Sequence, residues 1–227
     1  MPCMDTNKLP YLKAMGIQPW QLKAAAEIPA PPSTIATTDW DSLRTAVINC
    51  TACSLSCTRT QVVFGVGNQN ADLMIIGEAP GFYEDKQGEP FVGRAGQLLN
   101  AMLQSIGFDR SQVYIANILK CRPPENRDPQ PEEVDLCTPF LQKQIALVQP
   151  KVLLAVGRIA AHYLLDTKSS LNQLRRKVHA YGPEQTQLIV TYHPAYLLRT
   201  PSDKAKAFQD LQVVSRYLNF TDSLVTS

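Results

Sequence analysis

This sequence alternates regularly between short apolar runs and longer stretches with helical periodicity. Four aliphatic, β-branched runs are bounded by turn residues, at 73–77, 113–117, 152–156 and 188–192. Helical periods occupy 94–106, 131–148, 158–165 and 203–218. Because strands that are apolar on both sides need cover on both sides, this order predicts a three-layer α/β/α fold around a central four-stranded parallel sheet.

Polar and aromatic residues follow three of these runs, where a functional site is expected. Ligands of open parallel sheets bind beyond the carboxyl ends of the strands. A glycine-rich loop leaves the first run, an asparagine ends the second, and a His-Pro pair follows the last. The side chains that stand out are those of Glu78, Glu84, Phe91, Asn117 and His193. Each of them alone is more often a turn, cap or structural residue, so their common location carries the prediction.

The cysteines form a second pattern. Four of the six make a candidate ligand set, consisting of Cys50, Cys53, Cys121 and Cys137. Cysteines in a reducing compartment are thiols or metal ligands rather than a disulfide framework. Four thiolates hold either an iron-sulfur cubane or zinc, and the sequence alone does not separate these. Cys57 and Cys3 are interpreted as bystanders.

Four segments in order resemble family 4 of the uracil-DNA glycosylase superfamily, and they cover the chain from about residue 40 to 218. They are Gly-Glu-Ala-Pro-Gly at 77–81, Pro-Phe-Val-Gly at 90–93, Asn117 with Lys-Cys-Arg-Pro-Pro at 120–124, and His-Pro-Ala with Leu-Leu-Arg at 193–199. The resemblance implies an enzyme that flips uracil out of single- or double-stranded DNA and hydrolyses its N-glycosidic bond. Its products would be an abasic site and free uracil.

The resemblance also implies roles for single residues. The uracil-binding group would comprise Gly77, Glu78, Ala79, Phe91, Asn117 and His193. In that group Phe91 stacks on the base, Asn117 bonds its Watson–Crick edge, and His193 donates to the departing uracil. Better-known relatives carry Asp where this chain has Ala79. Glu78, Glu84 and a dissociative path without a carboxylate therefore remain alternatives for the water.

The same resemblance implies a structural [4Fe-4S] cluster on the four candidate cysteines. It also implies that Leu198 and Arg199 belong to a loop that wedges into DNA. The formal net charge of +2 does not by itself indicate a nucleic-acid binder, but residues 168–206 are locally basic. Within this stretch we expect Arg175 and Arg176 to contact DNA.

The chain is long enough for one catalytic domain with appendages, and we expect that domain at 39–219. Asp39 is predicted to cap a helix starting at Trp40. An arm at 1–27 faintly resembles the partner-binding N-terminus of the clamp-loader psi subunit, which would link the protein to replication or repair proteins. A helix packing on the domain is the alternative. Residues 28–38 form a Pro-rich linker and 220–227 a tail.

No apolar run is long enough to span a membrane and no signal peptide is evident, so we expect a cytoplasmic monomer that works on the nucleoid. Two rival functions remain open. One is a relative that binds uracil-DNA without turnover, or traps it covalently. The other is a nucleotide-binding α/β protein, although the first loop lacks a full Gly-x-Gly-x-x-Gly or a phosphate-binding Lys-Ser/Thr.

Overall fold

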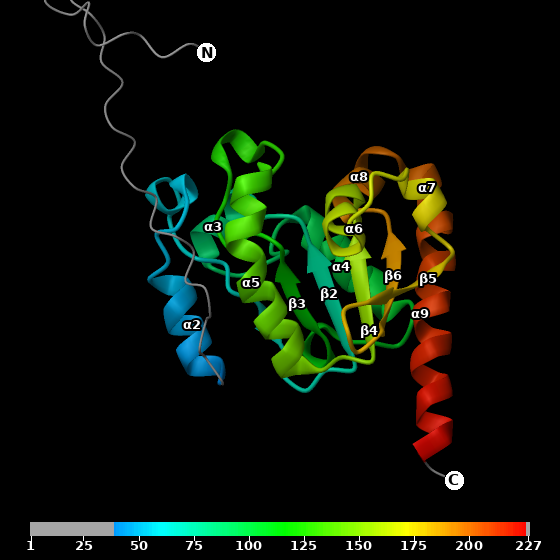
Figure 1. Ribbon diagram of the computed structural model, residues 1–227. Coiled ribbons are helices and arrows are strands. Elements are labelled where there is room, and N and C mark those ends of the chain that lie inside the picture. Colours follow the sequence, from blue (N-terminus) through cyan, green and yellow to red (C-terminus); the bar gives the residue numbers. More distant parts are fainter. Residues whose placement is uncertain (1–38, 226–227) are drawn as a thin grey trace, which may run out of the picture. The chain divides into compact units, whose positions relative to one another are not determined.

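The structure, a computed structural model, describes residues 39–225, with side chains described as far as Leu218 (Figure 1). The predicted arm at 1–27 and linker at 28–38 lie outside the described residues. Asp39 caps the helix that starts at Trp40 as predicted, since its Oδ1 accepts hydrogen bonds from the amides of Asp41 at 3.0 Å and Ser42 at 2.9 Å. The last helix continues to Val225, into the stretch predicted as a tail.

A six-stranded sheet with the order β1-β3-β2-β4-β6-β5 forms the centre. Its inner strands are parallel and confirm the predicted sheet: β2 (Leu73–Gly77), β3 (Tyr114–Asn117), β4 (Val152–Val156) and β6 (Thr186–Thr191). The prediction of four strands missed two antiparallel edge strands, β1 (Val66–Gly67) and β5 (Val178–Tyr181). β1 has only two residues and β5 is half-buried, so neither gives the continuous apolar run that marks an inner strand.

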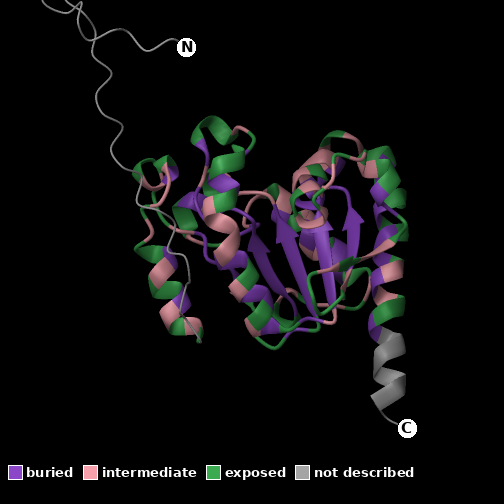
Figure 2. Cartoon of the chain, in the orientation of Figure 1, coloured by how far each residue is buried: buried purple, intermediate pink, exposed green. Residues whose placement is uncertain are grey.

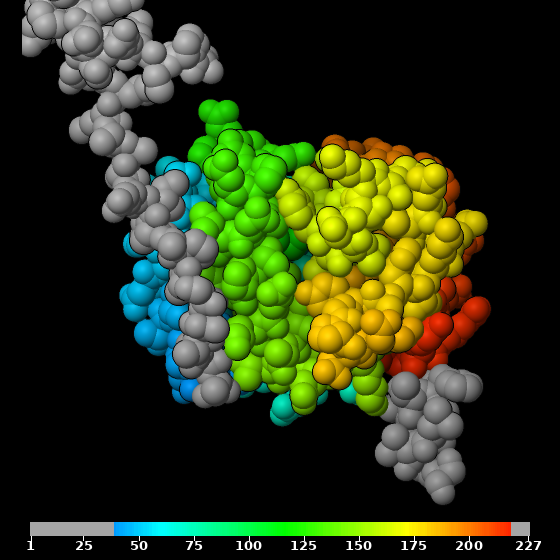
Figure 3. Space-filling model, viewed as in Figure 1, coloured from blue at the N-terminus to red at the C-terminus, as the bar shows by residue number. Residues whose placement is uncertain are grey.

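Helices cover both faces of the sheet, which confirms the three layers (Figure 1). One face packs on α4 (Arg94–Gln104), α8 (Pro194–Arg199) and α9 (Lys204–Val225). The other packs on α5 (Pro131–Val148), α6 (Arg158–Leu165) and α7 (Leu171–Leu174). The space-filling view shows α5 and the segments around α6 covering this second face (Figure 3). The remaining helices of residues 39–225 are α2 (Trp40–Ile48), α3 (Phe82–Gln87) and the 3-10 turns η2 (Ser54–Cys57), η3 (Arg110–Gln112), η4 (Pro124–Asn126) and η5 (Pro201–Asp203).

The strands β2, β3 and β4 are buried along their whole length, and β6 is buried over its last four residues (Figure 2). Along β2, Leu73 and Ile75 pack into one layer, whereas Met74 and Ile76 pack into the other. Full burial of such a side chain contributes roughly 1.5–3 kcal/mol. Two-sided burial therefore explains why these strands read as continuous apolar runs.

The strand order places a reversal at β2. From this strand the chain adds β3 on one side and then β4 and β6 on the other. Ligands of open α/β sheets bind at such a switch point, outside the carboxyl ends of the strands. Within residues 39–225, none of the helices has the length and hydrophobicity needed to cross a lipid bilayer.

Candidate functional site

A cavity of about 480 Å³ opens beyond the carboxyl ends of β2, β3 and β6. This volume lies in the usual range of small-ligand pockets, roughly 300–1,000 Å³. The predicted residues on its wall are Glu78, Ala79, Glu84, Phe91, Asn117, His193 and Arg199. Loops that are far apart in the sequence thus meet where the strand pattern predicted a site.

Asn117 presents an unused hydrogen-bond acceptor to this cavity. It ends β3, only 2% of it is exposed, and its Oδ1 is the one buried side-chain polar atom without a partner among the described residues. Leaving such a group unsatisfied costs about 1–3 kcal/mol. The folded chain therefore holds a place for a ligand that can donate a hydrogen bond to Asn117.

Gly77 keeps space open between Asn117 and the ring of Phe91. A Cβ at this position would lie 2.3 Å from Asn117 Oδ1 and 2.7 Å from Phe91 Cζ. Any side chain here would enter the cavity, so glycine is required by space rather than by an unusual backbone angle. The gap beside the buried Phe91 ring suits a flat ligand.

The backbone of Phe91 is held in a left-handed conformation, with φ of 53°. A non-glycine residue adopts this only when its surroundings enforce it. Gly96 allows the Phe91 carbonyl group to lie close to α4, because a Cβ on Gly96 would lie 1.7 Å from the Phe91 carbonyl oxygen. Arg110 also donates to the carbonyl oxygens of Pro90 at 2.5 Å and Phe91 at 3.4 Å. The loop is therefore built to aim this ring.

His193 is the N-cap of α8, and its Nδ1 accepts a hydrogen bond from the Ala195 amide at 3.1 Å. A neutral imidazole that accepts at Nδ1 carries its proton on Nε2. Burial, together with the positive charge of Arg199, lowers the pKa of His193 to about 4, so the ring is neutral at pH 7. The ring lies 5.7 Å from that of Phe91, centroid to centroid. His193 is thus a fixed neutral donor at the cavity.

The two predicted carboxylates differ in their surroundings. Burial raises the pKa of Glu78 to about 7, with Asp128 adding to the shift and Arg158 opposing it. Glu84 Oε2 accepts a hydrogen bond from the Gly81 amide at 2.8 Å and so closes the turn at the start of α3. Glu78 is the carboxylate that can exchange a proton near neutral pH.

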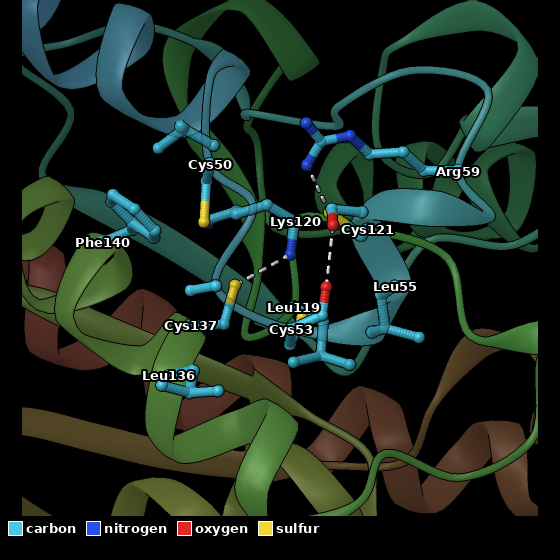
Figure 4. Close-up of a pocket in the computed structure, with 13 residues that line it drawn as sticks. Cys50, Cys53, Leu55, Arg59, Leu119, Lys120, Cys121, Leu136, Cys137 and Phe140 are labelled. Carbon is cyan, nitrogen blue, oxygen red and sulfur yellow. Dashed lines mark hydrogen bonds between the residues drawn. The ribbon is translucent and has the colours of Figure 1, made fainter. Parts of the chain in front are cut away.

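The four candidate cysteines line one small pocket, separate from the cavity (Figure 4). They come from the end of α2, the start of η2, the loop after β3, and α5. Burial raises the pKa of Cys137 to about 12 and also raises those of Cys53 and Cys121. Buried thiols become thiolates only where positive charge compensates them, as a metal centre does.

Hydrogen-bond donors point at these sulfur atoms. Arg59 donates to Cys121 Sγ at 3.1 Å, and the Lys120 amide donates to Cys137 Sγ at 3.3 Å (Figure 4). Among the described residues, no three His, Cys, Asp or Glu side chains converge closely enough to hold a metal ion. Zinc needs ligand sulfurs about 2.3 Å from one centre, whereas a cubane cluster is larger and holds its thiolates farther apart. Four thiols around one pocket are the donor set that an iron-sulfur cluster requires, and they also match the ligand type of zinc.

Cys57 is exposed and does not line this pocket, in keeping with its interpretation as a bystander. Cys3 lies outside the described residues.

The four predicted DNA contacts fall in different environments. Arg199 is exposed and lines the cavity, and Leu198 is half-buried beside it on α8. Arg176 is exposed and donates to Gln209 Oε1 at 2.9 Å.

The prediction for Arg175 is wrong, because this residue is only 4% exposed and its guanidinium is bound inside the protein. It donates to Asp210 at 2.7 Å, to the Tyr192 hydroxyl at 3.1 Å and to the Lys206 carbonyl at 2.7 Å.

Sequence reasoning assigned no role to Lys120, which is 1% exposed. Its Nζ donates to the Asn117 carbonyl oxygen at 2.7 Å and to Gln144 Oε1 at 2.6 Å. Burial lowers the pKa of Lys120 to about 8, while Cys137 and Cys121 act in the opposite direction. Its place in the Lys-Cys-Arg-Pro-Pro segment was the available signal. No sequence signal pointed to Arg110, because it lies outside every motif.

Comparison with known proteins agrees with this geometry. Residues 64–212 match the sequence model of the Uracil DNA glycosylase superfamily. The type-4 uracil-DNA glycosylase of Archaeoglobus fulgidus is 41% identical over 181 residues, covering 77% of this chain and 90% of that protein. That of Thermotoga maritima is 42% identical over 176 residues, covering 76% and 91% respectively. That of Sulfurisphaera tokodaii is 41% identical over 169 residues, covering 71% and 77%. The chain therefore belongs to the uracil DNA glycosylase superfamily and, within it, to the type-4 family.

Proposed function

We propose that this protein is a uracil-DNA glycosylase, which takes uracil out of DNA and hydrolyses its N-glycosidic bond to leave an abasic site. The observation that carries the proposal is the unsatisfied Oδ1 of Asn117, facing the space that Gly77 leaves beside the Phe91 ring. Uracil is flat and has an N3–H donor on its Watson–Crick edge. A base inside a duplex is stacked and paired, so it must be extruded to reach such a cavity.

Base recognition divides between two side chains. Phe91 supplies the stacking face, and the carboxamide of Asn117 accepts from N3–H and donates to O4 of uracil. Cytosine has no hydrogen on N3 and carries a donor at position 4, so it mismatches both groups. A site built to hydrogen-bond one pattern of donors and acceptors rejects a base with the reversed pattern, because the buried polar atoms of the site would then stay unpaired.

His193 stabilises the leaving group. As the glycosidic bond breaks, negative charge develops on the uracil oxygens, and the Nε2–H of a neutral histidine can donate to the O2 atom. A preorganised donor of this kind favours the transition state over the ground state. Because its Nδ1 is bound to the Ala195 amide, the ring does not need to reorient during the reaction.

Glu78 positions the attacking water. With a pKa raised to about 7, it is ionised above neutrality and can take a proton from water as the sugar cation is attacked. We assign this role to Glu78 rather than to Glu84, whose carboxylate is engaged with the Gly81 amide. Ala79 contributes no carboxylate and lines the cavity next to Glu78.

We further propose that Cys50, Cys53, Cys121 and Cys137 hold a [4Fe-4S] cluster. A bound cluster would cross-link the end of α2, the loop after Asn117 and α5, because the four cysteines come from these segments and line a pocket separate from the cavity. The exposed Cys57 provides a matched control. Cys137→Ser should abolish the visible absorption and the bound iron, whereas Cys57→Ser should keep both. A wild-type protein that contains zinc and no iron would refute the cluster.

The substrate surface would include Leu198 and Arg199 at the mouth of the cavity, with Arg176 farther away on the same basic stretch. The protein would act on DNA as a monomer and release free uracil. Binding of a replication or repair protein by residues 1–27 remains a prediction about residues outside those described.

The decisive experiment incubates the protein with a single-stranded oligonucleotide containing one uracil and then cleaves abasic sites with alkali. We expect cleavage at the uracil with multiple turnovers, and none when thymine or cytosine replaces uracil. A denaturant-stable protein–DNA adduct would instead identify a trapping relative. The absence of both products would leave a binding protein and overturn the proposal.

A further inference from the structure

Two large aromatic side chains lie side by side on the surface at the start of α3. Phe82 is 43% exposed and Tyr83 is 61% exposed, and they are the only consecutive pair among the exposed large hydrophobic residues of the described part of the chain. Their ring centroids are 5.4 Å apart, with the planes at 80°. Single exposed hydrophobic residues are common on protein surfaces, but a contiguous patch indicates a contact site.

This aromatic pair lies at the rim of the uracil cavity. Gly81 and Glu84, which flank the pair in the same helical turn, line the cavity wall. A Cβ on Gly93 would lie 3.7 Å from Tyr83 Cδ2, so the Tyr83 ring reaches the start of α4, just beyond the loop that carries Phe91. A strand whose uracil enters the cavity must therefore pass close to these rings.

Positive charge accompanies the pair. Lys86 Nζ lies 4.4 Å and the Arg122 guanidinium carbon 5.1 Å from the centre of the Phe82 ring. Arg127 and Arg199 line the cavity itself. Exposed aromatic rings beside cations suit a polyanion with flat, unpaired bases, which is the chemistry of single-stranded nucleic acid.

We infer that Phe82 and Tyr83 form a stacking platform for a base next to the extruded uracil in single-stranded DNA. Tyr83, the more exposed ring, takes the base, while Lys86 and Arg122 face the phosphates. The inference rests on the proposed function, because a strand that crosses the mouth of the uracil cavity, with or without a base in it, passes over this rim. Bases of a duplex are already stacked and paired, so the platform favours single-stranded over double-stranded substrate.

The test compares affinities of the full chain and its variants by fluorescence anisotropy, at fixed salt, for a uracil-free oligothymidylate and for a duplex of the same length. Stacking of one base on an aromatic ring accounts for roughly a 5- to 150-fold difference in affinity. We expect Tyr83→Ala to weaken single-strand binding about tenfold and duplex binding less than twofold. Tyr83→Trp, which keeps a ring, should bind as the wild type does.

Phe208→Ala is the matched control, because Phe208 is 42% exposed but lies on α9, which does not line the cavity. It should leave both affinities unchanged. An equal loss for both DNA forms in Tyr83→Ala, or no loss for either, would overturn the platform. These affinities do not depend on excision. If the wild type releases no uracil, the proposed function fails while the binding comparison still decides the platform.

Discussion

Gly77→Ala fills the proposed uracil cavity with one methyl group. Gly77 does not have a positive φ angle, so the backbone accepts alanine. The new Cβ would lie 2.3 Å from Asn117 Oδ1, and Cβ contacts under 3.0 Å essentially never occur. The Asn117 amide must therefore retreat by at least about 0.7 Å, and the Phe91 ring, 2.7 Å away, must also move.

The rate effect follows from this displacement. Misplacing a positioning group by roughly 1 Å costs about 100-fold in rate. Overpacking one methyl group costs about 1–3 kcal/mol of stability, which a folded domain usually tolerates. We therefore expect a folded Gly77→Ala protein whose single-turnover excision of uracil is about 100-fold slower.

The assay measures single-turnover release of uracil by alkali cleavage, with circular dichroism to check folding. Gly93→Ala is the control, because a Cβ there would make only an ordinary contact of 3.7 Å with Tyr83. It should excise uracil within about threefold of the wild-type rate. If folded Gly77→Ala also excised uracil at the wild-type rate, the space beside Phe91 and Asn117 would not be where the base binds.

Three other changes test separate parts of the account. His193→Ala should slow single-turnover excision by about 100- to 1,000-fold without weakening DNA binding, because it removes one preorganised donor. The pH–rate profile should rise through about pH 7, since the raised pKa of Glu78 leaves it protonated and inactive as a base below that value. Glu78→Gln should remove this rise, and no second titration should occur between pH 5 and 7, because the pKa of His193 is lowered to about 4. Arg175→Met should lower the free energy of unfolding by about 3–5 kcal/mol in chemical denaturation, because it leaves the buried carboxylate of Asp210 without its ion-pair partner. Its excision rate per folded molecule should not change.

Much of the fold was predictable because its inner strands are buried on both sides. Leu73 and Met74 face opposite layers and are both apolar, so β2 is a continuous hydrophobic run in the sequence. The edge strands β1 and β5 lacked this signal. Their pairing depends on backbone hydrogen bonds to β3 and β6. Backbone pairing of short or half-exposed segments leaves no hydrophobic pattern in the amino-acid sequence.

The site was predictable in its location but not in its supporting contacts. Asn117 and His193 could be assigned to one site because parallel strands bring their carboxyl ends together. Counting positive charges failed for Arg175, because its partner Asp210 lies 35 residues away in the sequence and only the folded chain joins them. The role of Lys120 in holding the Asn117 carbonyl likewise depends on Gln144, which lies 24 residues away on α5.

The most direct test of the central claim is a crystal structure of the protein with free uracil bound. We expect the uracil ring to stack on Phe91, its N3–H to donate to Asn117 Oδ1, and its O2 to accept from His193 Nε2. Uracil bound elsewhere, or bound in this cavity without a hydrogen bond to Asn117, would contradict the account.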